Sequence, residues 1–146
     1  FIDSVNVSSL AGLTGITRVN GSVSVANTPL TTLNPLNSLK TINGYLAISY
    51  NYQLTSIGIN NLDSTYGFLI NDLPMLTNLG PLTYNLKQKN ISTFWLISMP
   101  SLTSLSGLDS LHSALNFYVW VCSSITSLNG INQLRGDIPY GISLWA

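Results

Sequence analysis

A four-residue unit with apolar residues at both ends and polar residues between them recurs along the chain. It reads Leu-Thr-x-Leu, with Ile in place of a Leu in two copies, and its five copies are Leu30–Leu33, Leu54–Ile57, Leu76–Leu79, Leu102–Leu105 and Ile125–Leu128. Their first positions are separated by 24, 22, 26 and 23 residues. Near-copies at a steady period are the sequence signature of a repeat architecture.

Each unit follows a short stretch in which apolar positions alternate, as in Val23-Ser24-Val25 and Leu46-Ala47-Ile48. Alternation with a period of two predicts half-buried β-strands. Just before these strands lie four glycine dipeptides: Asn20-Gly21, Asn43-Gly44, Tyr66-Gly67 and Tyr140-Gly141. They predict corners, at which glycine permits a positive φ.

A repeat of this length is too short for a strand plus a long helix, and no repeat has a helical period over ten residues. Stacked repeats pair their strands in parallel and bury their apolar residues in ladders. The pattern therefore predicts an all-β fold, a single right-handed parallel β-solenoid of about 5–6 coils of 22–26 residues, over residues 1–146. We expect coils at roughly 1–21, 22–44, 45–67, 68–93, 94–116 and 117–140, with a partial coil at 141–146.

The ladders define an expected interior made of the inward strand residues and the ends of each Leu-Thr-x-Leu unit. It consists of Val23, Val25, Leu30, Leu33, Leu46, Ile48, Leu54, Ile57, Leu76, Leu79, Leu102, Leu105, Val119, Ile125 and Leu128. An apolar set at such regular intervals is enough to form a continuous core.

The outward strand positions change character along the chain. They are small or polar in the early coils, as at Ser24 and Ala47, and aromatic in the later ones. Residues 68–70 are apolar in both phases, so Ile70 is also an outward candidate. An exposed aromatic patch is typical of an interaction site. We therefore predict a partner interface at Trp95, Tyr118, Trp120 and Trp145, unless a flanking segment of the same polypeptide covers it.

Charged residues make up only 7% of the chain, Glu is absent and the net charge is zero. This composition argues against a nucleic-acid partner, which needs a basic surface. No apolar run approaches the roughly 20 residues of a membrane span, so direct membrane insertion is not expected. The chain begins without Met, so either a signal peptide has been removed or this is a piece of a longer chain.

Three N-glycosylation sequons are present, at Asn6, Asn20 and Asn90. Together with the near absence of charge they favour an extracellular or cell-surface location, with a glycan attached to the protein. Asn90 is the strongest of the three, because the 26-residue interval is expected to place it on a bulged loop. Asn20 is weaker, since Asn20-Gly21 is also a corner motif.

Candidates for catalysis or metal binding are isolated along the chain. His112 has Asp109 three residues upstream but no nucleophile or further ligand, so we expect a solvated loop histidine. The single Cys122 excludes an internal disulfide and ends an apolar strand, where a small core residue is expected. Asp63 and Asp109 occupy related loops two coils apart, roughly 9–10 Å along the axis. We predict no enzyme, no metal site and no cofactor.

The Thr of each unit forms a rank of Thr31, Thr55, Thr77, Thr103 and Thr126, with a second polar residue beside each. Some ice-binding solenoids present two such ranks on a flat strand. Here the two polar residues are adjacent between leucines, a pattern that favours a hydroxyl ladder at a turn, where it satisfies backbone groups.

Residues 39–57 read Leu-x-x-Ile-Asn-Gly-x-Leu-x-Ile followed by Leu-Thr-Ser-Ile. This segment resembles the receptor L-domain of insulin- and EGF-receptor ectodomains and the related repeats of fungal, protist and bacterial surface proteins. The resemblance extends from about residue 10 to residue 146. It implies a leucine-rich-repeat-like solenoid at the cell surface, and it carries over no ligand-contact residue.

Three functions compete. The first is a non-enzymatic extracellular structural or adhesive protein, which associates with itself or with another extracellular protein through the sheet face and the solenoid ends. The second is a receptor-type ectodomain that recognises a protein or glycan ligand. The third is ice binding.

Overall fold

The structure is a computed structural model, and it describes residues 2–87, 90–135, 138 and 142–145. Over these residues the chain forms short parallel strands and two 3-10 turns. The strands are β1 (Ile2–Asp3), β2 (Arg18–Val19), β3 (Val23–Ala26), β4 (Thr41–Ile42), β5 (Tyr45–Ser49), β6 (Gly67–Asn71), β7 (Asn90–Ile97), β8 (Ser113–Trp120) and β9 (Ile142–Trp145). The turns are η1 (Ala11–Leu13) and η2 (Asn34–Leu36).

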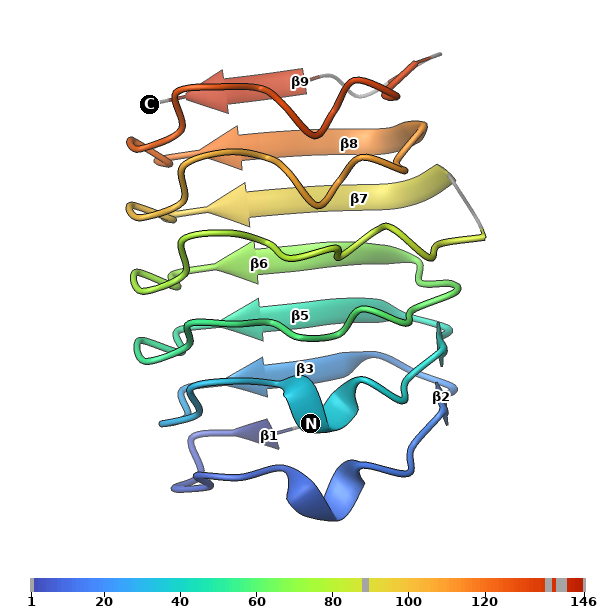
Figure 1. Cartoon of the computed structure of the whole chain (residues 1–146), viewed down its shortest axis with the longest axis vertical. Coiled ribbons are helices and arrows are strands. Elements are labelled where there is room, and N and C mark those ends of the chain that lie inside the picture. Colours follow the sequence, from blue (N-terminus) through green and yellow to red (C-terminus); the bar gives the residue numbers. More distant parts are fainter. Residues whose placement is uncertain (1, 88–89, 136–137, 139–141, 146) are drawn as a thin grey trace.

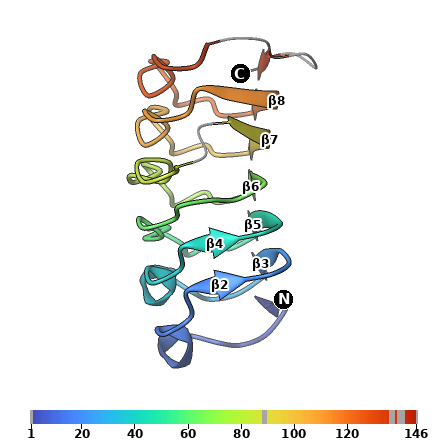
Figure 2. The same ribbon diagram turned by 90° about the vertical axis from the view of Figure 1, so that its right-hand side faces the viewer.

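The strands stack into a β-solenoid of about six turns. One sheet has seven parallel strands in the order β1-β3-β5-β6-β7-β8-β9, and a second, smaller one pairs β2 with β4. In Figure 1 the large sheet forms the back layer, the loops cross in front of it, and the chain climbs from the N-terminal coil to the C-terminal one. Figure 2 shows the stack from the side, with β2 and β4 facing the viewer and the loops that carry η1 and η2 along the left edge. The predicted all-β parallel solenoid is confirmed.

The register places like residues above one another inside the stack. Strand pairing aligns Phe68 with Phe94 and Phe94 with Phe117. The rings of Phe94 and Phe117 are stacked, with centroids 5.3 Å apart, and those of Phe68 and Phe94 meet edge to face at 5.8 Å. These rings lie in the inward rank that starts at Val23. Each coil thus buries apolar surface against both neighbours, which a single coil could not do alone.

Most of the expected interior is buried. The exceptions lie near the ends of the stack: Val23 and Ile125 are half-buried against the core, and Leu128 is 47% exposed. The expectation for Leu128 was wrong, because no described coil lies beyond its own to complete the ladder. The outward assignment of Ile70 was also wrong: Ile70 pairs with Ile48 and Leu96 in an inward rank and is fully buried.

The corner that follows each of the strands β1, β3, β5, β6, β7 and β8 has a left-handed backbone. Its residues are Ser4, Asn27, Tyr50, Asp72, Ser98 and Val121, with φ between 51° and 54°. Each donates its backbone N–H to the last residue of the next strand, as in Asn27 N to Ser49 O at 3.2 Å and Val121 N to Trp145 O at 2.9 Å. The corner therefore continues the ladder of the sheet while it turns the chain away from it.

Gly21, Gly44 and Gly67, which precede the strands, do not have the positive φ that we expected, and Gly141 lies outside the described residues. Positive φ occurs instead at Gly58, Gly80, Gly107 and Gly130, on the opposite side of the coil. At Gly44 the requirement is space, since a Cβ would lie 2.5 Å from the Ser22 hydroxyl oxygen. At Gly67 a Cβ would collide with the Thr93 carbonyl oxygen of the next strand.

In four of the five Leu-Thr-x-Leu units, the side-chain oxygen of the second polar residue accepts from the backbone N–H two residues downstream. Thr32 Oγ1 accepts from Asn34 N at 3.1 Å, and Ser127 Oγ accepts from Asn129 N at 3.1 Å. In the same way, Asn78 Oδ1 accepts from Gly80 N, and Ser104 Oγ accepts from Ser106 N. The second polar residues therefore satisfy backbone groups at a turn, as the sequence favours.

Candidate functional site

The outward face of the large sheet includes two long ranks of side chains set by the strand register. One rank runs Ser24, Ala47, Leu69, Trp95, Tyr118 and Ser143; the other runs Ala26, Ser49, Asn71, Ile97, Trp120 and Trp145. Side chains are small or polar over β3 and β5 and large and aromatic over β7, β8 and β9. The outward side chains thus become larger and more apolar towards the C-terminal end of the stack.

The aromatic patch, as we call Trp95, Ile97, Tyr118, Trp120 and Trp145, lies across β7, β8 and β9. Trp95, Trp120 and Trp145 are 42%, 54% and 67% exposed. The rings of Trp95 and Tyr118 meet edge to face, with centroids 5.8 Å apart and an interplanar angle of 87°. The structure thus brings the four aromatic residues singled out in the sequence onto one surface.

A hollow of about 320 Å³ lies within the aromatic patch. It is lined by Tyr118, Trp120, Ser143 and Trp145, which combine three aromatic rings with one hydroxyl side chain. Because the lining residues come from two adjacent strands held in register, the sheet fixes their backbone positions. The hollow offers flat apolar surface to a ligand together with a small number of polar groups.

A second aromatic pair lies on the same face, where strands β5 and β6 begin. The rings of Tyr45 and Tyr66 are 5.1 Å apart in an edge-to-face arrangement. The Tyr45 ring also lies over Gly67, where an added Cβ would approach it to 3.1 Å. Gly67 is buried for this reason although its position faces outward. This pair acts as a cover for the glycine.

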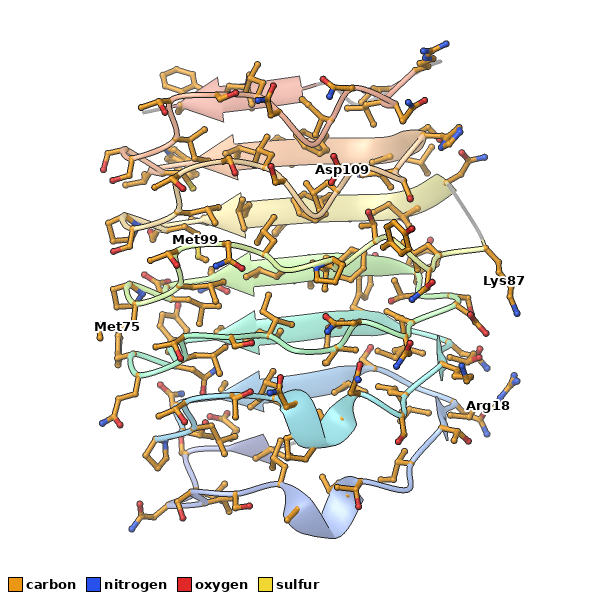
Figure 3. The ribbon with its side chains drawn as sticks, in the orientation of Figure 1. Arg18, Met75, Lys87, Met99 and Asp109 are labelled. Atoms are coloured by element: carbon orange, nitrogen blue, oxygen red, sulfur yellow. The ribbon has the colours of Figure 1, made fainter. Side chains whose placement is uncertain are left out.

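Charged side chains lie mainly away from the aromatic patch. Figure 3 shows Arg18 and Lys87 extending from the edge at which the strands begin, and Asp109 on the loop side. Lys87 Nζ and Asp63 Oδ2 form an ion pair at 3.1 Å. Asp3, in β1, is the one charged residue within the described strands of the large sheet. Hydrogen bonds from Asn27 and Ser4 lower the pKa of its carboxyl.

The residues considered for catalysis are not brought together. Asp63 pairs with Lys87, whereas Asp109 Oδ2 accepts from Gly107 N at 2.8 Å within its own turn. His112 is exposed, and its Nδ1 lies 3.0 Å from the Ser110 carbonyl oxygen. In the described part of the chain, no three His, Cys, Asp or Glu residues are grouped so that they could hold a metal ion.

Cys122 is a buried thiol at the corner that follows β8. Burial raises the pKa of the thiol, and backbone hydrogen bonds offset this only in part. Its Sγ lies 3.7 Å from Leu96 O and 3.4 Å from Trp120 O. A protonated, buried thiol is a poor nucleophile, in line with the core role expected of it.

The three sequon asparagines are all exposed. Asn6 lies on the loop after β1, and Asn20 lies between β2 and β3, where its Oδ1 accepts from Arg18 Nε at 3.2 Å. Asn90 is the first residue of β7 rather than part of a bulged loop, so that detail of the expectation was wrong. Residues 88–89, which precede Asn90 in the sequence, lie outside the described residues.

Together, the parallel ladder and the exposed aromatic face define a solenoid domain with a binding-type surface and no assembled catalytic group among its described residues. The family model of the Receptor L domain matches residues 2–76, just over half of the chain. The chain belongs to the Receptor L domain family, whose members are ligand-binding, non-enzymatic modules of receptor-type ectodomains. No curated protein and no solved structure matches the chain.

The family is typically extracellular. In addition, none of the helical segments in the described ranges is both long enough and apolar enough for a bilayer span.

Proposed function

We propose that this protein is a non-enzymatic extracellular recognition domain that binds a partner through the aromatic patch on its large sheet. The observation that carries the proposal is the exposure of Trp95, Trp120 and Trp145 on one surface. Tryptophan and tyrosine dominate the energetics of binding surfaces, because they bury a large area while losing little conformational entropy. Membership of a ligand-binding family supports the same function.

A binding test compares the 146-residue chain with a Trp120→Lys, Trp145→Lys double variant. Each is labelled and applied to the intact cells of its native source and to their extracellular material. We expect the unmodified chain to be retained and the double variant to lose most of this retention, because two charges would have to be buried against the partner. Tyr52→Lys, at an exposed tyrosine outside the strands, is the matched control. Equal retention of all three proteins would contradict the proposal.

Self-association through the solenoid ends is a second candidate, favoured by a separate observation. At the C-terminal end, Leu128 and Leu144 are 47% and 46% exposed although both belong to inward ranks. At the opposite end, a hollow of about 290 Å³ is lined in part by Ile2, Leu13 and Ile16. Apolar end surfaces of this kind favour contact between copies, in a structural or adhesive role.

A further inference from the structure

We propose that the aromatic patch is a platform for a neutral polysaccharide, on which pyranose rings lie against Trp120 and Trp145 at the hollow that these residues line with Tyr118 and Ser143. This inference rests on the proposed function, since it names the chemical class of the partner that the same surface recognises.

The first argument is the match between the surface and the two faces of a sugar. A pyranose ring presents C–H groups on its flat faces and hydroxyl groups around its rim. The indole faces of Trp120 and Trp145 offer apolar area of the same kind, with a partial negative charge that attracts C–H groups. Ser143 and Tyr118, both half-buried and both with a hydroxyl group in the side chain, also line this largely apolar hollow.

The second argument is charge. None of the side chains within the described residues of β5 to β9 is charged. An acidic glycan or a phosphorylated partner would need Arg or Lys at the contact. Protein partners commonly use Arg as an anchor and charged residues at the rim to set orientation. A neutral polysaccharide needs no charged side chain at the contact, so it fits this uncharged surface better than an acidic ligand or a protein partner does.

The third argument is spacing and rigidity. Trp95 and Trp145 lie on strands two steps apart in the sheet, which separates them by about 10 Å across the strands. That separation is comparable to the length of a disaccharide, so sugar rings two units apart in one chain can contact these two tryptophans. The edge-to-face contact of Trp95 with Tyr118 holds these two rings in place before binding. A preorganised surface loses less entropy when the ligand binds.

The test uses the 146-residue chain and a defined set of polymers. Cellulose, chitin, β-1,3-glucan and mannan are the neutral probes, and heparin and polygalacturonate are the acidic ones. Retention is measured by co-sedimentation, and affinity by the tryptophan fluorescence change on titration with the matching soluble hexasaccharide. The variants are Trp120→Ala and Trp145→Ala, and Tyr52→Ala is the control at an exposed tyrosine outside the strands.

We expect retention on at least one neutral polymer, little change in that retention when the salt concentration is raised, and about tenfold weaker binding for each tryptophan variant. Tyr52→Ala is expected to bind as the unmodified chain does. Failure of every neutral polymer, or retention that salt removes and the tryptophan variants leave unchanged, would overturn the polysaccharide proposal. If neutral polymers fail while Trp120→Lys, Trp145→Lys still loses retention on native material, recognition by the patch stands and its partner is of another class. If the double variant loses nothing, the proposed function fails as well.

Discussion

At the residue scale, one buried asparagine replaces an apolar core residue without leaving a polar atom unpaired. Asn51 Nδ2 donates to Val25 O at 2.8 Å and to Ser49 O at 2.9 Å, and its Oδ1 accepts from Thr28 N and Thr28 Oγ1. Cys122 makes the corresponding contacts three strands later, to Leu96 O and Trp120 O. Both residues bond carbonyls at the ends of strands, and Ser49 O and Trp120 O accept in addition from the corner N–H groups of Asn27 and Ser98.

Leu54→Ala is expected to be strongly destabilising. Leu54 is fully buried in the ladder of Leu-Thr-x-Leu units, with coils above and below it, so truncation leaves a cavity that the neighbours cannot fill. The expected loss is about 2–5 kcal/mol in the free energy of unfolding. Urea denaturation followed by far-ultraviolet circular dichroism measures it. Tyr52→Ala, at an exposed position two residues away, should change the same quantity by less than about 0.5 kcal/mol, and similar losses for both would contradict the ladder.

A glycan on at least one of Asn6, Asn20 and Asn90 is expected if the source is a secreting eukaryote. All three side chains are exposed, and an exposed sequon is open to the transferase. Intact mass spectrometry of protein from its native source measures the addition, and Asn→Gln variants assign it to a site. An intact mass equal to that of the bare polypeptide would contradict the prediction.

At the scale of elements, the same left-handed corner recurs along the large sheet, although different types of residue occupy it. Asn27, Asp72 and Ser98 tolerate the left-handed backbone comparatively well, but Val121 is β-branched and has the same conformation, with φ of 53°. A left-handed φ costs an L-residue roughly 1–2 kcal/mol, and Asn less than most. The stacking of the coils thus holds the corner residue in a left-handed conformation even where that residue type disfavours it.

Val121→Asn is therefore expected to raise the free energy of unfolding by about 0.5–1 kcal/mol. The reverse change in the preceding coil, Ser98→Val, places a β-branched residue at the same kind of corner and is expected to lower it by a similar amount. Both are measured by urea denaturation. If Ser98→Val were neutral, the left-handed corner would carry no strain for a β-branched side chain.

The sequence was sufficient for the class of fold because the repeating unit places two core residues at fixed positions in every coil. It was not sufficient where both phases of a strand are apolar. Leu69 faces outward and Ile70 inward because pairing with Ala47 and Trp95 fixes the phase. A signal was available: Ala47, Leu69, Trp95 and Tyr118 each lie seven residues before the first apolar residue of a Leu-Thr-x-Leu unit.

The reason for the glycines before the strands and the position of Asn90 could not be predicted from the sequence, because both depend on how the coils stack. Gly44 and Gly67 are needed for close approach to the neighbouring coil, which depends on what lies above and below them. Propensity reasoning considers only the local backbone, so it assigned them a positive φ instead. Likewise, the length of the long coil indicated extra residues but not where strand β7 would begin.

At the scale of the whole molecule, the two ends of the described stack differ from its middle. The core ladders are covered on both sides in the central coils, whereas Leu128 and Leu144 lie at a surface hollow of about 190 Å³ shared with Val119 and Trp145. Strand β9 is the last in the sheet order, so in the described structure its outer backbone groups have no partner strand. An unpaired strand edge beside apolar side chains is a template for association.

We therefore expect the isolated 146-residue chain to associate at high concentration through this end. Sedimentation equilibrium should show oligomers for the unmodified chain and monomers for Leu128→Asp, Leu144→Asp, because the charges would be buried in the contact. Trp95→Lys, Trp120→Lys alters the aromatic patch without touching the residues that line this end hollow, and it is expected to retain most of the association. If the unmodified chain remains monomeric at high concentration, the end contact is ruled out.

The orientation of the large sheet also determines how the molecule would respond to a pulling force. Its strands lie across the line that joins the two ends of the stack, so the hydrogen bonds between strands point along that line (Figure 1). A pull between the ends would open one strand pair at a time, as a zipper opens, instead of shearing many bonds together. Val23 and Leu46 are paired 23 residues apart, so each opened coil would release about 80 Å of chain. At a cell surface such a domain would lengthen in steps under load and would serve as an extensible tether as well as a binding surface.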